Sequence, residues 1–386
     1  MSGVATASPV PAQEAGIPQP QTTVQPAGGP FVRYANEGNF RQYDVPGVPF
    51  GGLVMPPLVA IPGYVRRFRI KVKATGGVNG TTTVAAAADA PYSVFQNVQL
   101  KDAFGTTLLQ MPGYELKLWN KYSGQNRMWA YSDPSALPSY SPVSVGASGT
   151  GDFTFSLSIP LEFVKGYGVV SMANASLLPT LQFTLAGDTA VYTTAPGTPP
   201  TNEVRVDAAM YWLPEQDVIP PGLGSTIQAI MQVANPTIGS GSSQLVTFPR
   251  LGGYIDCFIL VLRDSTNARI DAWPERLKFW VDGIPMIDID TNDLIDDMTD
   301  AYQLNGSVAG AARETGVLVI TRKTSLGQVI FGLLDTLETV LSTNPGTLLA
   351  VEGSPWGTIA NAPATLSLIA GQIVPSARLI QGLPEV

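Results

Sequence analysis

The chain has 386 residues, of which 45% are hydrophobic and only 13% are charged. This length exceeds one ordinary core and suits two domains of about 150–200 residues each. The formal net charge of −8 argues against a protein that coats the phosphate backbone of nucleic acid. Cys257 is the only cysteine, which excludes an intrachain disulfide and therefore a secreted disulfide scaffold.

The 39 glycines and 33 prolines punctuate the chain too often for long helices and favour short strands joined by turns. We expect no secretory signal peptide, because Pro9 and Pro11 interrupt the start and the first basic residue is Arg33. The longest uncharged apolar stretch, 50–65, contains three prolines and predicts no transmembrane helix. A soluble protein made in a reducing compartment is expected.

Residues 1–30 are rich in Pro, Gly, Gln, Ala and Thr and carry one charge, at Glu14. Such a segment buries too little apolar surface to offset the entropy of ordering it, so we predict a flexible N-terminal arm. The arm is either a tail without a role or a segment that becomes ordered against a partner subunit.

A first globular unit is predicted over residues 31–218. Apolar and polar residues alternate over 153–159 and again over 181–185, which is typical of strands with one buried and one solvated face. A short helix is expected at 114–122. The inward side chains of a third alternating strand are predicted to be Val204, Val206, Ala208, Met210 and Trp212.

The stretch 252–291 repeats the order of an earlier stretch. Gly253-Tyr254 precedes a predicted strand over 256–263, and Gly63-Tyr64 precedes one over 66–73. The corresponding apolar faces are Phe68, Ile70 and Val72 in the first copy and Phe258, Leu260 and Leu262 in the second.

A β-hairpin is predicted after each of these strands. In the first copy it joins 94–100 to 106–111, and in the second it joins 277–281 to 284–289 through the turn Asp282-Gly283. Two similar all-β units in one chain are therefore expected.

The second unit is predicted over 219–386, after the boundary Ile219-Pro220-Pro221-Gly222. Its strand at 317–320 is apolar on both faces. In the strand 256–263, Cys257, Ile259 and Val261 stand where the strand 66–73 of the first unit has Arg67, Arg69 and Lys71. We expect this apolar face to be covered by a helix, by the first unit or by a neighbouring chain, with Cys257 a buried hydrophobe.

Two amphipathic helices are predicted in the second unit. Asn292 is expected to cap the first helix. The apolar face of this helix consists of Leu294, Ile295, Met298 and Tyr302. The opposite face carries Asp296, Asp297 and Asp300. Ser325 is expected to cap the second, with an apolar face of Leu326, Ile330, Leu333, Leu334, Leu337 and Leu341 packed against a sheet.

The sequence contains no histidine, which removes Ser-His-Asp and Cys-His catalysis, histidine general bases and histidine-bearing zinc sites. It also lacks the glycine-rich motifs that bind phosphate and the Gly-x-Ser-x-Gly nucleophile motif. A carboxylate pair of the glycosidase type cannot be picked out among 30 acids. We therefore predict a protein that is not an enzyme, with no catalytic, cofactor-binding or metal-binding residue and no cofactor.

The acidic run 288–300 is the place to test for an ion site. Asp288, Asp290 and Asn292 match positions one, three and five of a calcium loop. The pattern then fails, because Asp293 replaces the required glycine and the twelfth residue is a threonine. Acids at a solvated helix start are the favoured interpretation, and an incidental divalent ion is the alternative.

A basic strand carries Arg67, Arg69, Lys71 and Lys73 on one face. Nucleic-acid binding is one interpretation. A solvent-facing strand side that pairs with acids of this or a neighbouring chain is favoured, because the whole chain is acidic and no exposed aromatic residues alternate with the bases.

Several segments together resemble a known family. They are Ala60-Ile61-Pro62-Gly63-Tyr64 with the strand 66–73, the hairpin 97–111, and the pair 153–163 and 176–185. In this order they resemble the double jelly-roll major capsid proteins of icosahedral viruses with an internal membrane, in particular the tectivirus group of phages. The second unit departs from the family pattern, because it lacks a clean counterpart to Ile159-Pro160-Leu161.

This resemblance implies an all-β chain of two tandem jelly-roll sandwiches, with a few short helices and the arm at 1–30. Three chains would form a pseudo-hexagonal capsomer that tiles an icosahedral shell. Implied partners are neighbouring capsomers, penton and minor capsid proteins and, through the arm, an inner membrane, without sequence-specific nucleic-acid binding. The implied location is the virion, with the host cytoplasm before assembly. A carbohydrate-binding or carbohydrate-cleaving sandwich is the alternative, since lectins also use jelly rolls.

Overall fold

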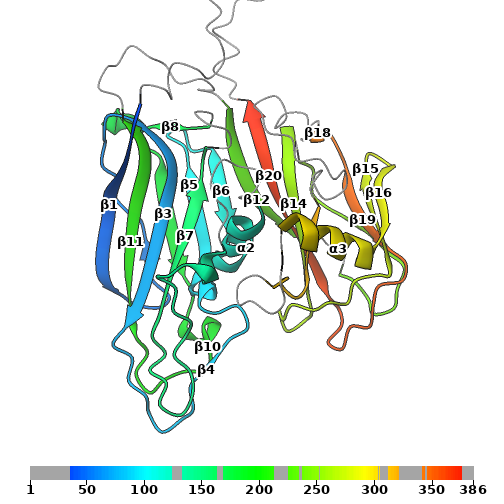
Figure 1. Ribbon diagram of the computed structural model, residues 1–386, viewed down its shortest axis with the longest axis horizontal. Helices are drawn as coiled ribbons and strands as arrows, with labels where there is room; N and C mark the ends of the chain where they lie inside the picture. The colour runs from blue at the N-terminus through cyan, green and yellow to red at the C-terminus, as the bar shows by residue number, and fades with distance from the viewer. Residues whose placement is uncertain are drawn as a thin grey trace, which may run out of the picture.

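The structure is a computed structural model, and it describes residues 35–123, 133–162, 168–212, 225–233, 237–251, 253–302, 304, 312–320, 341–343 and 346–375. Three predicted features lie outside these residues: the arm at 1–30, the boundary at 219–222 and the helix after Ser325. The described strands form layers that run across the molecule from one side to the other (Figure 1). No helix among the described residues combines the length and apolar character that crossing a bilayer requires.

The outer layer of the first half is an antiparallel sheet. Its strands, in spatial order, are β1 (Asn36–Val48), β11 (Thr201–Trp212), β3 (Tyr64–Thr75) and β7 (Phe153–Pro160), with the short β8 (Val170–Ser171) also paired to β3.

The middle layer is a nine-stranded sheet that contains strands of both halves. Its path is β17 (Val317–Ile320), β14 (Gly253–Arg263), β20 (Thr365–Pro375), β12 (Ser225–Val233), β6 (Thr107–Met111), β5 (Phe95–Lys101), β9 (Thr180–Leu185) and β2 (Leu53–Val54), with β18 (Leu341–Thr343) paired to β14. The halves meet where β12 pairs in parallel with β6, through Ala229 opposite Leu109 and Ile230 opposite Gln110.

The outer layer of the second half is a four-stranded antiparallel sheet. Its order is β13 (Gln244–Thr247), β19 (Leu349–Gly353), β15 (Arg276–Val281) and β16 (Ile284–Asp290). The remaining described elements are β4 (Ala85–Ala86) with β10 (Tyr192–Thr194), the helices α2 (Gly113–Ser123) and α3 (Thr291–Tyr302), and the short 3-10 helices Tyr92–Val94, Pro134–Ala136, Ala175–Leu177 and Asp188–Ala190.

The repeated strand and hairpin are confirmed. Strands β3 and β14 both begin at the Gly-Tyr pairs, and the hairpins β5–β6 and β15–β16 follow them. At the β15–β16 turn Asp282 has φ 49° and Gly283 has φ 78°. Two consecutive positive φ values twist a two-residue turn with the hand that a hairpin needs, which explains the Asp-Gly pair.

The predicted alternation is confirmed in β7 and β9 and fails at the end of β11. Met210 and Tyr211 are both buried, whereas Trp212 is 44% exposed. The register between β11 and β3 shifts at Ala209 and Met210. The two-residue period is therefore broken, and the prediction that Trp212 points inward is wrong.

Two details of the second half also differ from prediction. Helix α3 is present and buries Leu294, Met298 and Tyr302, but it begins at Thr291. Asn292 therefore lies inside its first turn and does not cap it. Leu341, expected on a helix, begins strand β18 and pairs with Ile255 of β14.

One contiguous cluster contains most of the described buried apolar side chains of both halves, and Val169 and Tyr211 form a small separate one. The two sandwiches therefore share a core surface instead of packing as separate bodies. The expectation that the second face of β14 is covered is confirmed, since Cys257, Ile259 and Val261 are fully buried. Cys257, the only cysteine of the sequence, is buried, as predicted.

Candidate functional site at the junction of the two sandwiches

Helix α2 lies between the two halves and contacts β5 and β7 on one side and β14 and β20 on the other (Figure 1). All of its residues except Asn120 are buried. It starts at Gly113, where an added Cβ would lie 2.2 Å from the carbonyl oxygen of Tyr92. Glycine therefore allows the helix to begin directly against the preceding segment of the first half.

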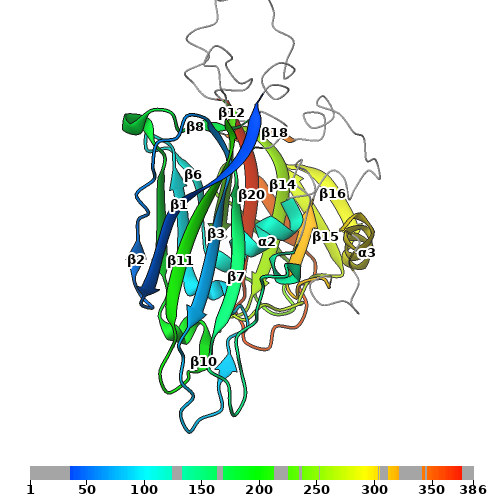
Figure 2. The same cartoon turned by 60° about the vertical axis from the view of Figure 1, so that its left-hand side comes forward.

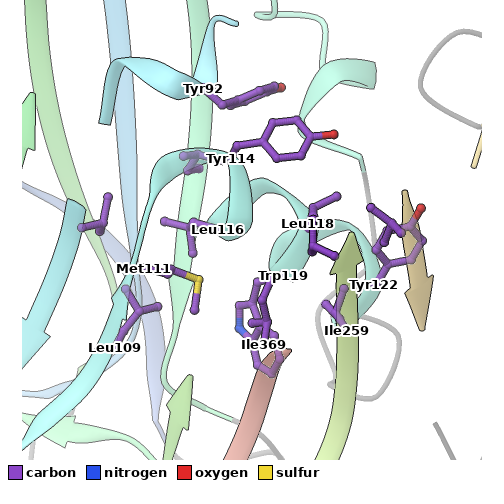
Figure 3. Close-up of a cluster of buried hydrophobic side chains, with 14 of the residues drawn as sticks. Tyr92, Leu109, Met111, Tyr114, Leu116, Leu118, Trp119, Tyr122, Ile259 and Ile369 are labelled. Atoms are coloured by element: carbon purple, nitrogen blue, oxygen red, sulfur yellow. The ribbon is translucent and has the colours of Figure 1, made fainter. Parts of the chain in front are cut away.

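The apolar side of the junction is formed by large side chains of α2. Figure 3 shows Trp119 and Tyr122 projecting from α2 toward Ile369 of β20 and Ile259 of β14. Trp119, Tyr122 and both isoleucines are fully buried. The apolar face of β14 that contains Ile259 is therefore covered by a helix of the first half. Two of the three predicted explanations, cover by a helix and cover by the first unit, thus apply together.

The polar side of the junction begins at Arg263 of β14. Its guanidinium donates to Asp89 at 2.7 Å and to Glu115 of α2 at 2.8 Å. Arg269 donates to the other oxygen of Asp89 at 2.8 Å and lies 4.4 Å above the ring of Tyr114. Two arginines of the second half thus bind carboxylates and an aromatic ring of the first half.

Glu314 is the reverse case, a carboxylate of the second half surrounded by the first. It accepts hydrogen bonds from Tyr114 at 2.9 Å and from Lys117. Lys121 donates to Glu314 at 3.2 Å and to the carbonyl oxygen of Ala312 at 2.6 Å. These contacts join residues about 200 positions apart in the chain, so they form only in the folded protein.

The charges at the junction balance. We call it the junction cluster, and its four acids and four bases are Asp89, Glu115, Asp133, Glu314, Lys117, Lys121, Arg263 and Arg269. The side chains of Lys117, Lys121 and Asp133 are at most 4% exposed. Ions removed from water this completely require partners, and the cluster supplies one for each.

The pKa of Glu314 reports how strongly the cluster holds its charge. Burial alone would raise the pKa of this carboxyl, but the positive charges of Lys117 and Lys121 outweigh burial and lower it to about 2. Burial lowers the pKa of Lys117, against the opposing effect of Glu314. The geometry of the cluster fixes how the two sandwiches are oriented, because each buried ion is paired with an opposite charge.

A second buried polar group lies at the end of the first sandwich. Arg66 donates to Glu162 at 2.7 Å and stacks 4.2 Å from the centre of the Tyr211 ring. Tyr211 donates to the same carboxylate at 2.7 Å. These bonds hold Tyr211 inward, which explains why Trp212 takes the exposed position.

The predicted ion-site candidates do not converge. Asp288 is held by two hydrogen bonds from Arg276, at 2.6 and 3.0 Å. Asp290 and Asn292 are exposed, at the end of β16 and the start of α3. Within the described part of the chain, no three acids or cysteines come together to hold a metal ion.

The basic strand faces outward, as predicted, with neighbouring acids of its own chain. In the register of β3 with β11, Lys73 lies opposite Glu203 and Arg69 lies opposite Asp207. Opposite charges directly across two strands stabilise the pairing. The favoured interpretation, a solvent-facing side paired with acids, is confirmed for Arg69 and Lys73. It does not describe Lys71, which lies opposite Arg205, or Arg67, which is half-buried opposite Ala209.

Sequence reasoning found α2 as a helix but missed its role. The signal was available, because Glu115, Lys117 and Lys121 sit in a helix whose other residues are mostly large and apolar. Glu115 lies four residues before Trp119, on the same side of the helix, so it could not face solvent while Trp119 was buried. No pattern along the chain indicated that the partners of these charged residues are Arg263 and Glu314.

The sequence matches no protein-family model and no curated protein. Solved structures match over nearly the whole chain. The STIV MCP is 14% identical, covers 90% of this chain and 100% of its own, and has a TM-score of 0.60. The major capsid protein P2 of bacteriophage PM2 is 10% identical, covers 89% and 99%, and has a TM-score of 0.50. The Faustovirus major capsid protein is 9% identical, covers 94% and 93%, and has a TM-score of 0.53.

At these identities the likeness concerns the fold. The chain is an all-β protein with the double jelly-roll fold found in major capsid proteins of viruses, and the resemblance inferred from the sequence is confirmed at that level. Its two sandwiches are held by a shared sheet and by the junction cluster.

Proposed function

We propose that this chain is a major capsid protein that works by assembly and not by catalysis. The observation that carries the proposal is the junction itself. Helix α2 makes a buried apolar contact and three ion pairs with the second half, and Asp89 adds a further ion pair with Arg263, which makes the subunit one stiff block. A shell subunit needs that stiffness, because its outer faces must keep a fixed angle to one another.

In this proposal three copies form a homotrimer of six sandwiches with a pseudo-hexagonal outline, and these capsomers tile an icosahedral virion shell. Residues 31–218 make the first jelly roll and residues 219–386 the second. The fold of the PM2 capsid protein supports a bacteriophage setting. Neighbouring capsomers, penton and minor capsid proteins are the proposed partners.

The arm at 1–30 is proposed to contact neighbouring capsomers or an inner membrane. The host cytoplasm holds the chain before assembly. The net charge of −8 suits a shell whose genome is kept apart by lipid, and we propose no sequence-specific binding to nucleic acid.

The test is the size and outline of the purified full-length chain. Mass photometry and negative-stain imaging are expected to show trimers, three times the 40.8 kDa chain mass, with a hexagonal outline. A chain that stays monomeric at every concentration and is retained on an immobilised glycan would contradict the proposal and favour a carbohydrate-binding sandwich. Binding to DNA at physiological salt that falls steeply as salt rises would favour a nucleic-acid role.

A further inference from the structure

Two apolar patches lie at the far edges of the two sandwiches, one beginning in β2 of the nine-stranded sheet and one in β16 of the four-stranded sheet. The first patch is Leu53, Met55 and Val59, which are 54–59% exposed. The second patch is Ile284, Met286 and Leu348, which are 41–63% exposed. In Figure 2, β2 and β16, which begin these patches, lie on opposite sides of the molecule.

The first patch closes the edge of the first sandwich. It begins in β2, the last strand of the nine-stranded sheet. It ends at Val59, whose backbone N–H donates to the side chain of Gln42 in β1 at 2.8 Å. Because β1 is the last strand of the other sheet, the segment bridges both layers. Exposed and buried residues alternate along the segment 53–59, and Val54 and Pro56 are buried. The exposed side chains Leu53, Met55 and Val59 therefore form one stripe.

The second patch lies at the matching edge of the second sandwich. Ile284 and Met286 belong to β16, the last strand of the four-stranded sheet. The N–H of Leu348 donates to the side chain of Asp282 at 2.7 Å, which places Leu348 beside the β15–β16 turn. Exposed apolar residues on a terminal strand invite pairing with another chain unless they are covered.

We call the edge of the molecule that carries the first patch the first end, and the edge that carries the second patch the second end. The charges around the two ends differ in sign. Helix α3 contacts β16 and β17 at the second end and exposes Asp293, Asp296 and Asp300. Around the first end, the charged residues of the outer sheet that are not buried are six bases, Arg41, Arg67, Arg69, Lys71, Lys73 and Arg205, against four acids, Glu37, Asp44, Glu203 and Asp207. Two second ends facing each other would bring acids against acids, whereas a second end facing a first end brings acids toward bases.

We propose that the first patch of one copy packs against the second patch of the next copy. The occupant of each patch is therefore a second copy of this chain, and the contact joins unlike surfaces. Unlike contacts repeated around an axis close into a ring, whereas contacts between like patches stop at a dimer. Both patches contain a methionine, whose flexible side chain adapts to an apolar partner. This inference rests on the proposed trimer and names the surfaces that build it.

The experiment uses two variants that each disable one patch. Leu53→Asp with Met55→Asp removes the first patch, and Ile284→Asp with Met286→Asp removes the second. Native mass spectrometry is expected to show trimers for the wild type and monomers for each variant alone. Val145→Asp is the matched control, because Val145 is 53% exposed in a loop outside both patches, and it is expected to remain trimeric.

Mixing the two variants tests the unlike pairing directly. Each variant keeps one working patch, so an equimolar mixture is expected to give a one-to-one heterodimer that cannot close into a ring. Homodimers of either variant, or a mixture that stays monomeric, would overturn the pairing.

Two further outcomes separate this inference from the proposed function. A wild-type chain that is never trimeric contradicts the proposed function. A trimeric wild type whose two variants remain trimeric contradicts only the assignment of the patches. Far-UV circular dichroism checks folding, and Leu53→Ser with Met55→Ser and Ile284→Ser with Met286→Ser repeat the test if an aspartate variant fails to fold.

Discussion

Glu314 is the residue on which the two halves of the chain most visibly depend. It lies in the second half, yet its hydrogen-bonding side chains Tyr114, Lys117 and Lys121 all come from α2. A carboxylate in this position neutralises two lysines that are almost fully buried. Removing one partner of such a pair leaves an uncompensated buried charge, which costs more than the pair itself contributes.

We therefore expect Glu314→Gln to lower the free energy of unfolding by about 3 kcal/mol. Urea unfolding at pH 7 measures the change. The matched control is Glu352→Gln, because Glu352 is a half-buried acid 3.7 Å from Lys278, and a glutamine oxygen can still accept its hydrogen bond from Trp280. Its cost is expected to stay below about 1 kcal/mol. Equal losses in both variants would show that the junction cluster has no special role in stability.

The pH dependence of stability follows from the same carboxyl. The pKa of Glu314 falls from an ordinary 4.5 to about 2 on folding. A carboxyl whose pKa is lower in the folded state stabilises that state at pH values above its pKa in the unfolded chain. This contribution is lost as the pH falls from 4.5 toward 2. The advantage of the wild type over Glu314→Gln is expected to shrink across that window, measured by urea unfolding at several pH values. A constant difference between pH 7 and pH 2.5 would contradict the assignment.

At the same scale, Trp212 shows where prediction from sequence stops. Strict alternation placed it inward with Met210, because nothing in the sequence marks a register shift. The shift comes from a long-range network in which Arg66 and Glu162, far from β11 in the chain, hold Tyr211 inside. Single-strand periodicity carries no information about such partners.

At the scale of elements, α2 acts as the joint between sandwiches. Its Trp119 is fully buried against β14 and β20 of the second half (Figure 3). We expect Trp119→Ala to lower the free energy of unfolding by about 3–5 kcal/mol, since it leaves a large cavity at the junction. Thermal and urea unfolding measure the loss.

Trp212→Ala is the matched control for this substitution, because the same residue type is 44% exposed at the end of β11. Its cost is expected to be below about 1 kcal/mol. A small loss for Trp119→Ala would mean that α2 packs loosely and that the ionic contacts alone join the halves.

The elements themselves were largely predictable. Each hairpin was marked by alternating strands and a turn residue such as Gly283, and α3 by its apolar period. These are local signals, read within about ten residues. The parallel pairing of β12 with β6 has no such signal, because Ala229 and Leu109 are brought together only by the packing of the whole chain.

At the scale of the whole molecule, the shared core predicts how the protein unfolds. Two separate domains would melt independently. Here one sheet and one apolar cluster continue through both sandwiches. We expect a single calorimetric transition whose calorimetric and van't Hoff enthalpies agree, even for a chain of this length. Two resolved transitions, or one that splits in the wild type at pH 7, would show that the halves are independent.

Glu314→Gln is expected to split that transition or to broaden it, because it weakens the junction and leaves both sandwich interiors unchanged. Differential scanning calorimetry of the variant at pH 7 makes the measurement. A sharp single transition shifted to lower temperature would show that the shared sheet alone couples the halves.

The parallel join between β6 and β12 has a mechanical consequence. A hinge motion between the two sandwiches would have to break the backbone hydrogen bonds between β6 and β12. These bonds therefore oppose rotation of one sandwich relative to the other. The two sandwiches therefore tilt together as one plate. If rigid subunits of this kind build a curved shell, the shell can bend only at the interfaces between chains. Its curvature is then set by the angles at those interfaces.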